Sequence, residues 1–360
     1  MQPLLAEKNI QVSAIYDPSA DSIARTRELF PGITVHDSYS SLLAEPGIDW
    51  VMIGSWNSQH AGQALQALEA GKHVFCEKPL ATSIEDCLRV RDVLEAHPGL
   101  HFFFGLVLRY SPHFQRIKAI LDSGDIGKVI SFEFNETLPP HHGGYIHGNW
   151  RRHRAHAGTH MLEKCCHDLD LANWLMGSIP SRVASFGGLD FFKPEFAGQE
   201  KRFGYDAAGK SPVYNLWRDP EGISPFNAHK DILDNQVVIL EYPSGTRATF
   251  HTNCHAVIPE RRFYICGSEG TLRADALAGT VEVRLLGGES RIETTCEGGS
   301  HAGGDEVMTR ALVQTIDSGA APLAGVGEGI SAAATAFAID QANDSGRVVA
   351  VDVRNLRSTL

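Results

Sequence analysis

The chain has 360 residues, of which 43% are hydrophobic and 21% are charged, a balance typical of a globular protein with two domains. Its formal net charge of −11 argues against nucleic acid or an anionic membrane surface as the main partner. The longest strongly apolar run, residues 102–108, is too short to span a bilayer. Seven scattered cysteines without a Cys-x-x-Cys pair indicate reduced thiols in a cytoplasmic protein, not a disulfide framework or a structural zinc site.

The first hundred residues alternate between strand and helix patterns. Strands are predicted at 12–16, 33–36, 49–55, 73–77 and 101–107, and helices at 19–30, 39–45, 58–71 and 83–97. Because such alternation favours parallel strands joined by crossover helices, the sequence predicts a doubly wound α/β sheet of Rossmann type over residues 1–105.

From residue 106 the pattern changes to longer alternating strands. A helix at 113–124 is followed by strands at 128–137, 235–242, 247–254, 261–267 and 281–286, and then by helices at 303–319 and 327–344 and a strand at 347–353. This pattern predicts an α+β domain over 106–360 with a large, mostly antiparallel open sheet. Two irregular stretches, 137–157 and 189–229, exceed ordinary loop lengths and are expected to form the site or an oligomer contact.

Asp17 closes the first predicted strand, in "VSAIYDP". An acid at this place in a Rossmann unit accepts hydrogen bonds from the adenosine ribose, which favours NAD over NADP. The glycine-rich turn should lie about 20 residues upstream, which is before the first residue, and the sequence contains no Gly-x-Gly-x-x-Gly. Met1–Leu5 look like the last turn of the helix that follows such a loop. The expectation is that the first strand and phosphate loop are missing, through truncation or a misplaced start codon.

Two further segments carry chemistry-bearing residues. The strand at 73–77 runs into Glu77, Lys78 and Pro79 without a turn residue, at a strand end where α/β proteins keep their ligand sites. Residues 161–177 are predicted as one helix on which Glu163 and His167 share a face, because they are four residues apart. The alternative interpretations are an exposed lysine before a helix start and a solvated helix face.

Six segments follow one another in a characteristic order and spacing: "AIYDP", "VMIGSWNSQHAGQALQALEAGKHVFCEKPLATS", "GLVLRYSPHFQRIK", "SGDIGKV", "NWRR" and "HDLDLANWL". Together with the closing "SGRVVAV" they resemble the Gfo/Idh/MocA family of NAD(P)-dependent sugar and polyol dehydrogenases, over nearly the whole chain. The resemblance implies a Rossmann domain followed by an open sheet, with the active site between them, and a homo-oligomer, either a dimer or a tetramer, packed through that sheet.

The resemblance also implies roles for the strand-end lysine and the helix. Lys78 would project toward the nicotinamide and the substrate hydroxyl, Glu77 is expected to bind the cofactor with it, and the peptide before Pro79 is usually cis in the family. His167 would take the hydroxyl proton, or exchange that role with Lys78 if burial lowers the pKa of the lysine. Glu163 stands where the family more often has aspartate, and would orient His167 or touch a substrate hydroxyl.

Further candidates follow from family positions. Ser55, Asn57 and His60 are expected to bind cofactor, although Trp56 replaces a proline that is common there and an ordinary loop is the alternative. Arg109 stands where the family places an arginine near the nicotinamide end, and it is also expected to bind the cofactor. The remaining substrate candidates are Tyr110, Trp150 and Arg151.

Seven histidines between His141 and His167 suggest a metal, but no fixed ligand set emerges and a polar substrate pocket is preferred. His301 and Asp305 could cap a helix or line the cleft. The leading hypothesis is hydride transfer between NAD(P) and a secondary hydroxyl of a sugar, polyol or sugar derivative. The alternatives are an NAD-dependent glycosidase of the same fold, or a non-catalytic protein that binds a sugar or a dinucleotide.

Overall fold

The computed structural model describes residues 10–203, 223–295 and 300–351. Met1–Leu5, predicted as a helical turn, lie outside the described residues, as does part of the stretch 189–229. The first half follows the predicted alternation. Its elements are β1 (Ala14–Ile15), α1 (Ala20–Leu29), β2 (Thr34–Val35), α2 (Tyr39–Leu43), β3 (Trp50–Ile53), α3 (Asn57–Glu69), β4 (His73–Cys76), α4 (Ile84–Glu95) and β5 (Phe102–Phe104).

Serine caps set the starts of three of these helices. The side chains of Ser19, Ser38 and Ser83 each accept a hydrogen bond from a first-turn amide of α1, α2 and α4. All the strand pairs are parallel, as predicted, and they fall into two sheets, β1-β2 and β3-β4-β5. The carboxyl ends of β3, β4 and β5 meet at one edge, which is where the candidate residues of this half begin.

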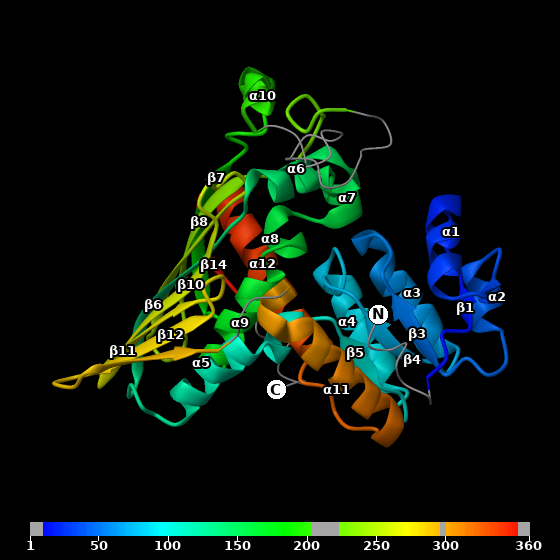
Figure 1. The fold of residues 1–360 in the computed structure, drawn as a ribbon, viewed down its shortest axis with the longest axis horizontal. Coiled ribbons are helices and arrows are strands. Elements are labelled where there is room, and N and C mark those ends of the chain that lie inside the picture. The colour runs from blue at the N-terminus through cyan, green and yellow to red at the C-terminus, as the bar shows by residue number, and fades with distance from the viewer. Residues whose placement is uncertain (1–9, 204–222, 296–299, 352–360) are drawn as a thin grey trace.

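The second half begins with a short 3₁₀ turn and contains the larger sheet (Figure 1). Its elements are η2 (Val107–Tyr110), α5 (Pro112–Asp122), β6 (Val129–Thr137), α6 (Pro140–Gly148), η3 (Trp150–Arg152), α7 (Arg154–Ala157), α8 (His160–Glu163), α9 (Cys166–Met176), β7 (Arg182–Gly188), η4 (Pro194–Gln199), α10 (Glu200–Phe203), β8 (Asn235–Glu241), β9 (Arg247–Asn253), β10 (Glu260–Gly267), β11 (Gly270–Asp275), β12 (Thr280–Leu285), β13 (Ser290–Thr294), η5 (Ser300–Gly303), α11 (Gly304–Ser318), α12 (Val326–Ser345) and β14 (Val349–Ala350).

The sheet of this half is open and mostly antiparallel, as predicted. Within the described residues its strand order is β13-β12-β11-β10-β6-β9-β8-β7-β14, and only β6 and β9 pair in parallel. Residues alternate between buried and exposed along β8, β9 and β10, so one face packs inward while the other meets solvent. Phe134, Phe250 and Phe263 stack on the inner face, and Phe114 of α5 packs edge-on against Phe263.

Two predicted segments differ from the structure. The single helix expected at 161–177 is divided into α8 and α9, because the amides of both Lys164 and Cys165 donate to the carbonyl of His160 and the second bond does not continue an α-helical turn. The stretch 137–157, expected to be irregular, contains α6, η3 and α7. Pro140 occupies the first turn of α6, a position that tolerates its missing amide hydrogen.

The last two helices pack back onto the first half of the chain. Leu312 of α11 is buried in a cluster with Phe75, Phe103 and Tyr110, and α12 lies against α4 and β5 (Figure 1). Residues from the end of the chain therefore complete the core beside the parallel strands. In the part of the chain that the structure describes, no helix has the length and apolar character needed to cross a membrane.

Candidate active site

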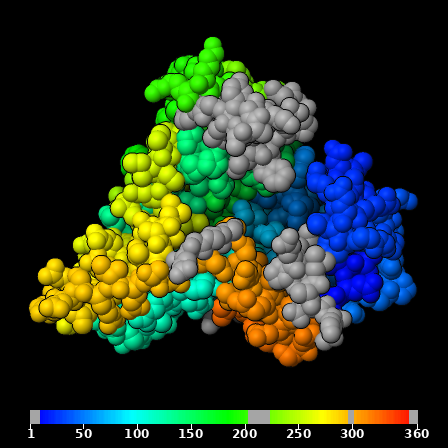
Figure 2. Space-filling model, viewed as in Figure 1, coloured from blue at the N-terminus to red at the C-terminus, as the bar shows by residue number. Residues whose placement is uncertain are grey.

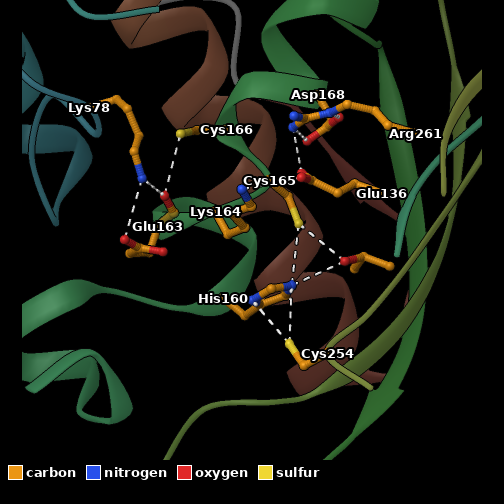
Figure 3. Close-up of polar contacts among 11 residues, drawn as sticks. Lys78, Glu136, His160, Glu163, Lys164, Cys165, Cys166, Asp168, Cys254 and Arg261 are labelled. Atoms are coloured by element: carbon orange, nitrogen blue, oxygen red, sulfur yellow. Dashed lines mark hydrogen bonds and ion pairs between the residues drawn. The ribbon is translucent and has the colours of Figure 1, made fainter. Parts of the chain in front are cut away.

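Lys78 connects the strand edge of the first half to α8 of the second. The chain leaves β4 at Cys76, and the Lys78–Pro79 peptide is cis. The Lys78 ammonium donates to the backbone carbonyl of Glu163 at 2.5 Å and lies 3.3 Å from its carboxylate oxygen Oε1 (Figure 3). Two of the candidate residues, Lys78 and Glu163, are thus in direct contact across the boundary between the two halves, a pairing that the sequence did not predict. The space-filling view shows the surface recessed between the blue N-terminal elements and the green and yellow second half (Figure 2).

Glu163 is buried among cations that keep it ionised. Burial alone would raise its pKa, but Lys78, Arg151 and Lys164 together hold the pKa below its ordinary value. Arg151 donates from Nε to Glu163 Oε1 at 3.0 Å. Burial is the largest influence on the pKa of Lys78 and lowers it, but Glu163, Cys166 and Glu77 together outweigh burial and the pKa is raised. Lys78 is therefore an ammonium, which does not favour the alternative in which it serves as the base.

His167 on α9 is buried and faces several cations. Burial lowers its pKa well below the usual value, and Lys78, Arg261, His301 and Lys164 lower it further. The ring is neutral near pH 7, as a proton acceptor must be. Its Nδ1 has no hydrogen-bond partner among the described residues, and its ring lies 6.1 Å from that of His301. Among the neighbouring charges, Lys78 lowers the pKa of His167 the most, so the two predicted groups share one electrostatic environment.

His301 comes from the segment before α11. It has a left-handed backbone, with φ of 50°, and Ala302 beside it has φ of 49°. Such conformations are strained for residues other than glycine. The His301 Nδ1 lies 3.0 Å from both carboxylate oxygens of Asp305. The sequence left open whether this pair caps a helix or lines the site, and the structure places His301 beside His167.

A buried charge network lies next to His167 and was missed from the sequence. Arg261 of β10 binds both carboxylate oxygens of Asp168 at 2.9 Å and one oxygen of Glu136 at 2.6 Å (Figure 3). Lys164 lies 3.2 Å from the other oxygen of Glu136. Glu136 and Arg261 are direct partners of β6 and β10, so only knowledge of the strand register would have paired them.

Two further substrate candidates, Trp150 and Arg151, pack against each other beside Glu163. The Arg151 guanidinium lies 4.2 Å from the ring centre of Trp150 and 4.4 Å from that of Tyr145. Trp150 in turn stacks on Trp56, with ring centres 5.4 Å apart. Trp150 and Arg151 are therefore close to the Lys78–Glu163 pair, although their roles stay predictions.

The cofactor candidates lie at strand ends of the first half. Asp17 follows β1, and one of its oxygens accepts from the Ser19 amide at 2.7 Å while the other has no partner among the described residues. The second carboxylate oxygen could accept a hydrogen bond from a ribose hydroxyl. Ser55 donates to Gln63, and Asn57 donates to the Ala157 carbonyl. Glu77 is packed behind Lys78, whose amide donates to it at 3.3 Å.

Three predicted site residues are buried in contacts with other residues of the protein. His60 has one ring nitrogen 2.7 Å from the Pro79 carbonyl and the other 3.1 Å from that of Ser55, which leaves neither for a cofactor. Arg109 forms a buried bidentate pair with Asp170, and this ion pair uses the donors expected near the nicotinamide. Tyr110 is buried against Phe103, so the substrate role predicted for it does not fit its position.

Solved structures with the same fold cover almost the whole chain. Levoglucosan dehydrogenase in complex with NADH and levoglucosan aligns with a TM-score of 0.77 at 18% identity, over 94% of this chain and 90% of that one. A putative myo-inositol dehydrogenase from Sinorhizobium meliloti 1021 aligns with a TM-score of 0.71 at 20% identity, over 98% and 95%. These likenesses establish a Rossmann-type parallel sheet followed by a large, mostly antiparallel sheet.

Sequence relatives agree with this fold. A putative oxidoreductase, YteT, of Bacillus subtilis is 23% identical over 84% of this chain and 82% of its own length. An inositol 2-dehydrogenase of Gluconacetobacter diazotrophicus is 34% identical over 46% of this chain and 47% of its own length. The family model for the NAD-binding Rossmann fold matches residues 1–103, and the model for the C-terminal alpha/beta domain matches residues 118–351. The chain therefore belongs to the Gfo/Idh/MocA oxidoreductase family.

Proposed function

We propose that the protein is an NAD(P)-dependent dehydrogenase that acts on a secondary hydroxyl of a sugar, a polyol or a sugar derivative. The observation that carries this proposal is the Lys78 ammonium, held against Glu163 across the two halves and next to the neutral His167. Relatives with the names inositol 2-dehydrogenase and levoglucosan dehydrogenase support a carbohydrate or polyol as substrate. We also propose that the cofactor domain ends near residue 105.

Oxidation of a hydroxyl requires only a few groups from this chain. NAD(P) would supply the hydride acceptor for the carbon that carries the hydroxyl, and Asp17 would hold its adenosine ribose. His167 takes the hydroxyl proton, because its imidazole is neutral and its Nδ1 has no hydrogen-bond partner among the described residues. Lys78 stabilises the negative charge that develops on the oxygen. Glu163 holds Lys78 and Arg151 in place through its two ion pairs, and it raises the pKa of Lys78. Asp17 supports NAD over NADP, because a carboxylate beside the ribose would repel the additional ribose phosphate that NADP carries.

Absorbance at the NADH band tests this proposal with a panel of sugars and polyols and with both NAD⁺ and NADP⁺. The wild-type protein should reduce NAD⁺ with at least one of them. Lys78→Ala should lower kcat by a factor of about 10² to 10⁴, the usual share of a positioned proton-transfer or oxyanion group, while circular dichroism shows an intact fold. Lys78→Arg keeps the charge and is the matched control.

The same assay separates the alternatives. Near-normal turnover by Lys78→Ala would remove the central assignment. Release of a chromophoric aglycone from nitrophenyl glycosides, without net NADH, would identify the glycosidase. Binding of sugar or dinucleotide by calorimetry, with no reaction in any assay, would identify a non-catalytic binding protein.

We further propose that the protein forms a homo-oligomer through the outer face of its large sheet. Phe186 of β7 is 74% exposed, and its partner Val237 and the nearby Ile239 of β8 are exposed beside it. Such a contiguous apolar face is typical of a protein contact. Sedimentation should show a wild-type dimer or tetramer and a Val237→Lys monomer, whereas Leu277→Lys, in an exposed turn, should leave assembly unchanged. A monomeric wild type would contradict this proposal.

A further inference from the structure

An exposed tryptophan lies at the start of α3, where a helix favours a different residue. Trp56 is the N-cap of α3, and its side chain makes no capping hydrogen bond. Serine, threonine, aspartate and asparagine are preferred there, because they accept a bond from the first turn. Trp56 is 46% exposed, whereas the next residue, Asn57, is buried and bonded to Ala157. Helix formation therefore does not account for tryptophan at this position.

Trp56 is the outer member of a stack that leads to the proposed reaction centre. Its ring is nearly parallel to that of Trp150, at 16°, with centres 5.4 Å apart, and it contacts His156 at 4.8 Å. Trp150 packs on the Arg151 guanidinium, whose Nε is 3.0 Å from Glu163. Two aromatic rings of the second half thus pack against Trp56, while 46% of its surface remains exposed to solvent.

We propose that Trp56 is a stacking subsite for a second sugar ring. This inference rests on the proposed function, in which the first ring is held at Lys78 and Glu163. The apolar C–H face of a pyranose packs on an indole, which offers a large, rigid contact area. Because the stack runs outward from Glu163, the ring that reaches Trp56 is the neighbour of the ring being oxidised. The substrate class is therefore a glycoside or an oligosaccharide.

Arg151 supplies the polar part of this subsite. Only its Nε has a hydrogen-bond partner among the described residues, and its side chain is 20% exposed. Its two Nη groups are therefore available to hydroxyl or linking oxygens between the two rings. A guanidinium fixed between Trp150 and Tyr145 loses little conformational freedom when it binds.

The test compares paired substrates with the whole protein. Oxidation of glucose, galactose and xylose is measured beside cellobiose, lactose and xylobiose, for the wild type and for Trp56→Leu and Trp56→Phe. Trp56→Leu should raise the KM for the disaccharides at least tenfold, change the KM for the monosaccharides less than twofold, and leave kcat within twofold. Trp56→Phe keeps an aromatic face and should raise the disaccharide KM less than threefold. Leu277→Ala, which removes an exposed apolar side chain in a turn outside the proposed sites, should change neither KM.

The outcomes separate this inference from the proposed function. If the wild type oxidises monosaccharides and disaccharides with equal kcat/KM and Trp56→Leu alters neither, the subsite is disproved and the dehydrogenase stands. If none of the six sugars is oxidised, calorimetric binding of the three disaccharides decides the subsite, and the proposed function fails only if the wider panel of sugars and polyols is not oxidised either. Binding that weakens at least tenfold in Trp56→Leu supports it, and equal or undetectable binding in the two proteins overturns it.

Discussion

Glu163 is the residue on which the charges of the candidate site depend. Its buried carboxylate lies 3.3 Å from the Lys78 ammonium and 3.0 Å from Arg151 Nε, and both of these cations are partly buried. Removal of a buried carboxylate that pairs with two such cations is costly, because it leaves them without compensation. The departure from the more common aspartate therefore concerns the length of the side chain, not its charge.

Replacement of Glu163 by glutamine should change the pH dependence of turnover. In the wild type, Glu163 raises the pKa of Lys78, so the ammonium persists to alkaline pH. In Glu163→Gln, burial, the largest influence, and Arg151 still lower the pKa of Lys78, and only the smaller effects of Cys166 and Glu77 still raise it. Activity that needs the ammonium is lost as pH rises through that pKa, so the alkaline limb of kcat/KM should move to lower pH. Profiles between about pH 6 and 10.5, around the reference pKa of lysine, measure this shift.

Glu163→Asp is the matched control, because it keeps the negative charge on a shorter side chain. Its alkaline limb should stay near that of the wild type even if its kcat falls. An unchanged limb in Glu163→Gln would show that Lys78 is not controlled by this carboxylate.

At the scale of elements, α8 is a single turn whose start is fixed by its neighbours. Thr159 accepts from the Leu162 amide and donates its hydroxyl to Asp340 of α12 at 2.6 Å. Gly158 precedes it with φ of +79°, and a Cβ there would meet Leu162 at 2.6 Å. A helix this short is not stable by itself, so these contacts place Glu163 and the carbonyl that binds Lys78.

Thr159→Val should therefore affect both stability and turnover. Loss of an N-cap costs about 1–2 kcal/mol, and Asp340 also loses its hydroxyl partner. The free energy of unfolding should fall by about that amount in urea titrations, and kcat should fall because the Glu163 carbonyl is less well positioned. Thr159→Ser keeps the hydroxyl and should resemble the wild type in both measurements. Equal losses in the valine and serine variants would show that the hydroxyl is not what holds α8.

The limits of prediction from the sequence are visible in these same elements. Strong period-two or helical patterns located β6, β8, β9 and β10 and all the longer helices, because each buries one face. The strands β7, β11 and β13 were not predicted, since glycine or charged residues weaken their alternation. The division between α8 and α9 was missed because "MLEKCCHDLDLANWLMG" keeps helical periodicity through it, and the break depends on backbone bonds that leave no pattern.

The candidate site was predictable only in part, for the same physical reason. Lys78, Glu163 and His167 lie at a strand end and on a helix face, positions that sequence patterns reveal. Arg109 and His60 have the same residue types as ligand-binding groups, but their donors are taken by Asp170 and by backbone carbonyls. Whether a polar side chain is occupied depends on tertiary contacts, and no spacing along the chain records them.

At the scale of the whole molecule, the two halves share a core although their strands belong to separate sheets. Leu312 of α11, near the end of the chain, is buried with Phe75 of β4, Phe103 of β5 and Tyr110 of η2. Lys78, Asn57 and Trp56 add polar and aromatic contacts across the same boundary. A chain of 360 residues would ordinarily unfold in stages, but contacts of this kind couple its parts.

Leu312→Ala should consequently destabilise both halves together. Removal of a buried leucine costs about 2–5 kcal/mol, since the cavity only partly closes. Far-UV circular dichroism and tryptophan fluorescence, to which Trp50 contributes from the first half and Trp174 from the second, should shift to lower urea by the same amount and still coincide. Leu323→Ala, at a half-exposed side chain, should lower the free energy of unfolding by less than about 0.5 kcal/mol. Two separate transitions in Leu312→Ala would instead show that the halves fold independently, and that the site at their boundary is assembled only after each has formed.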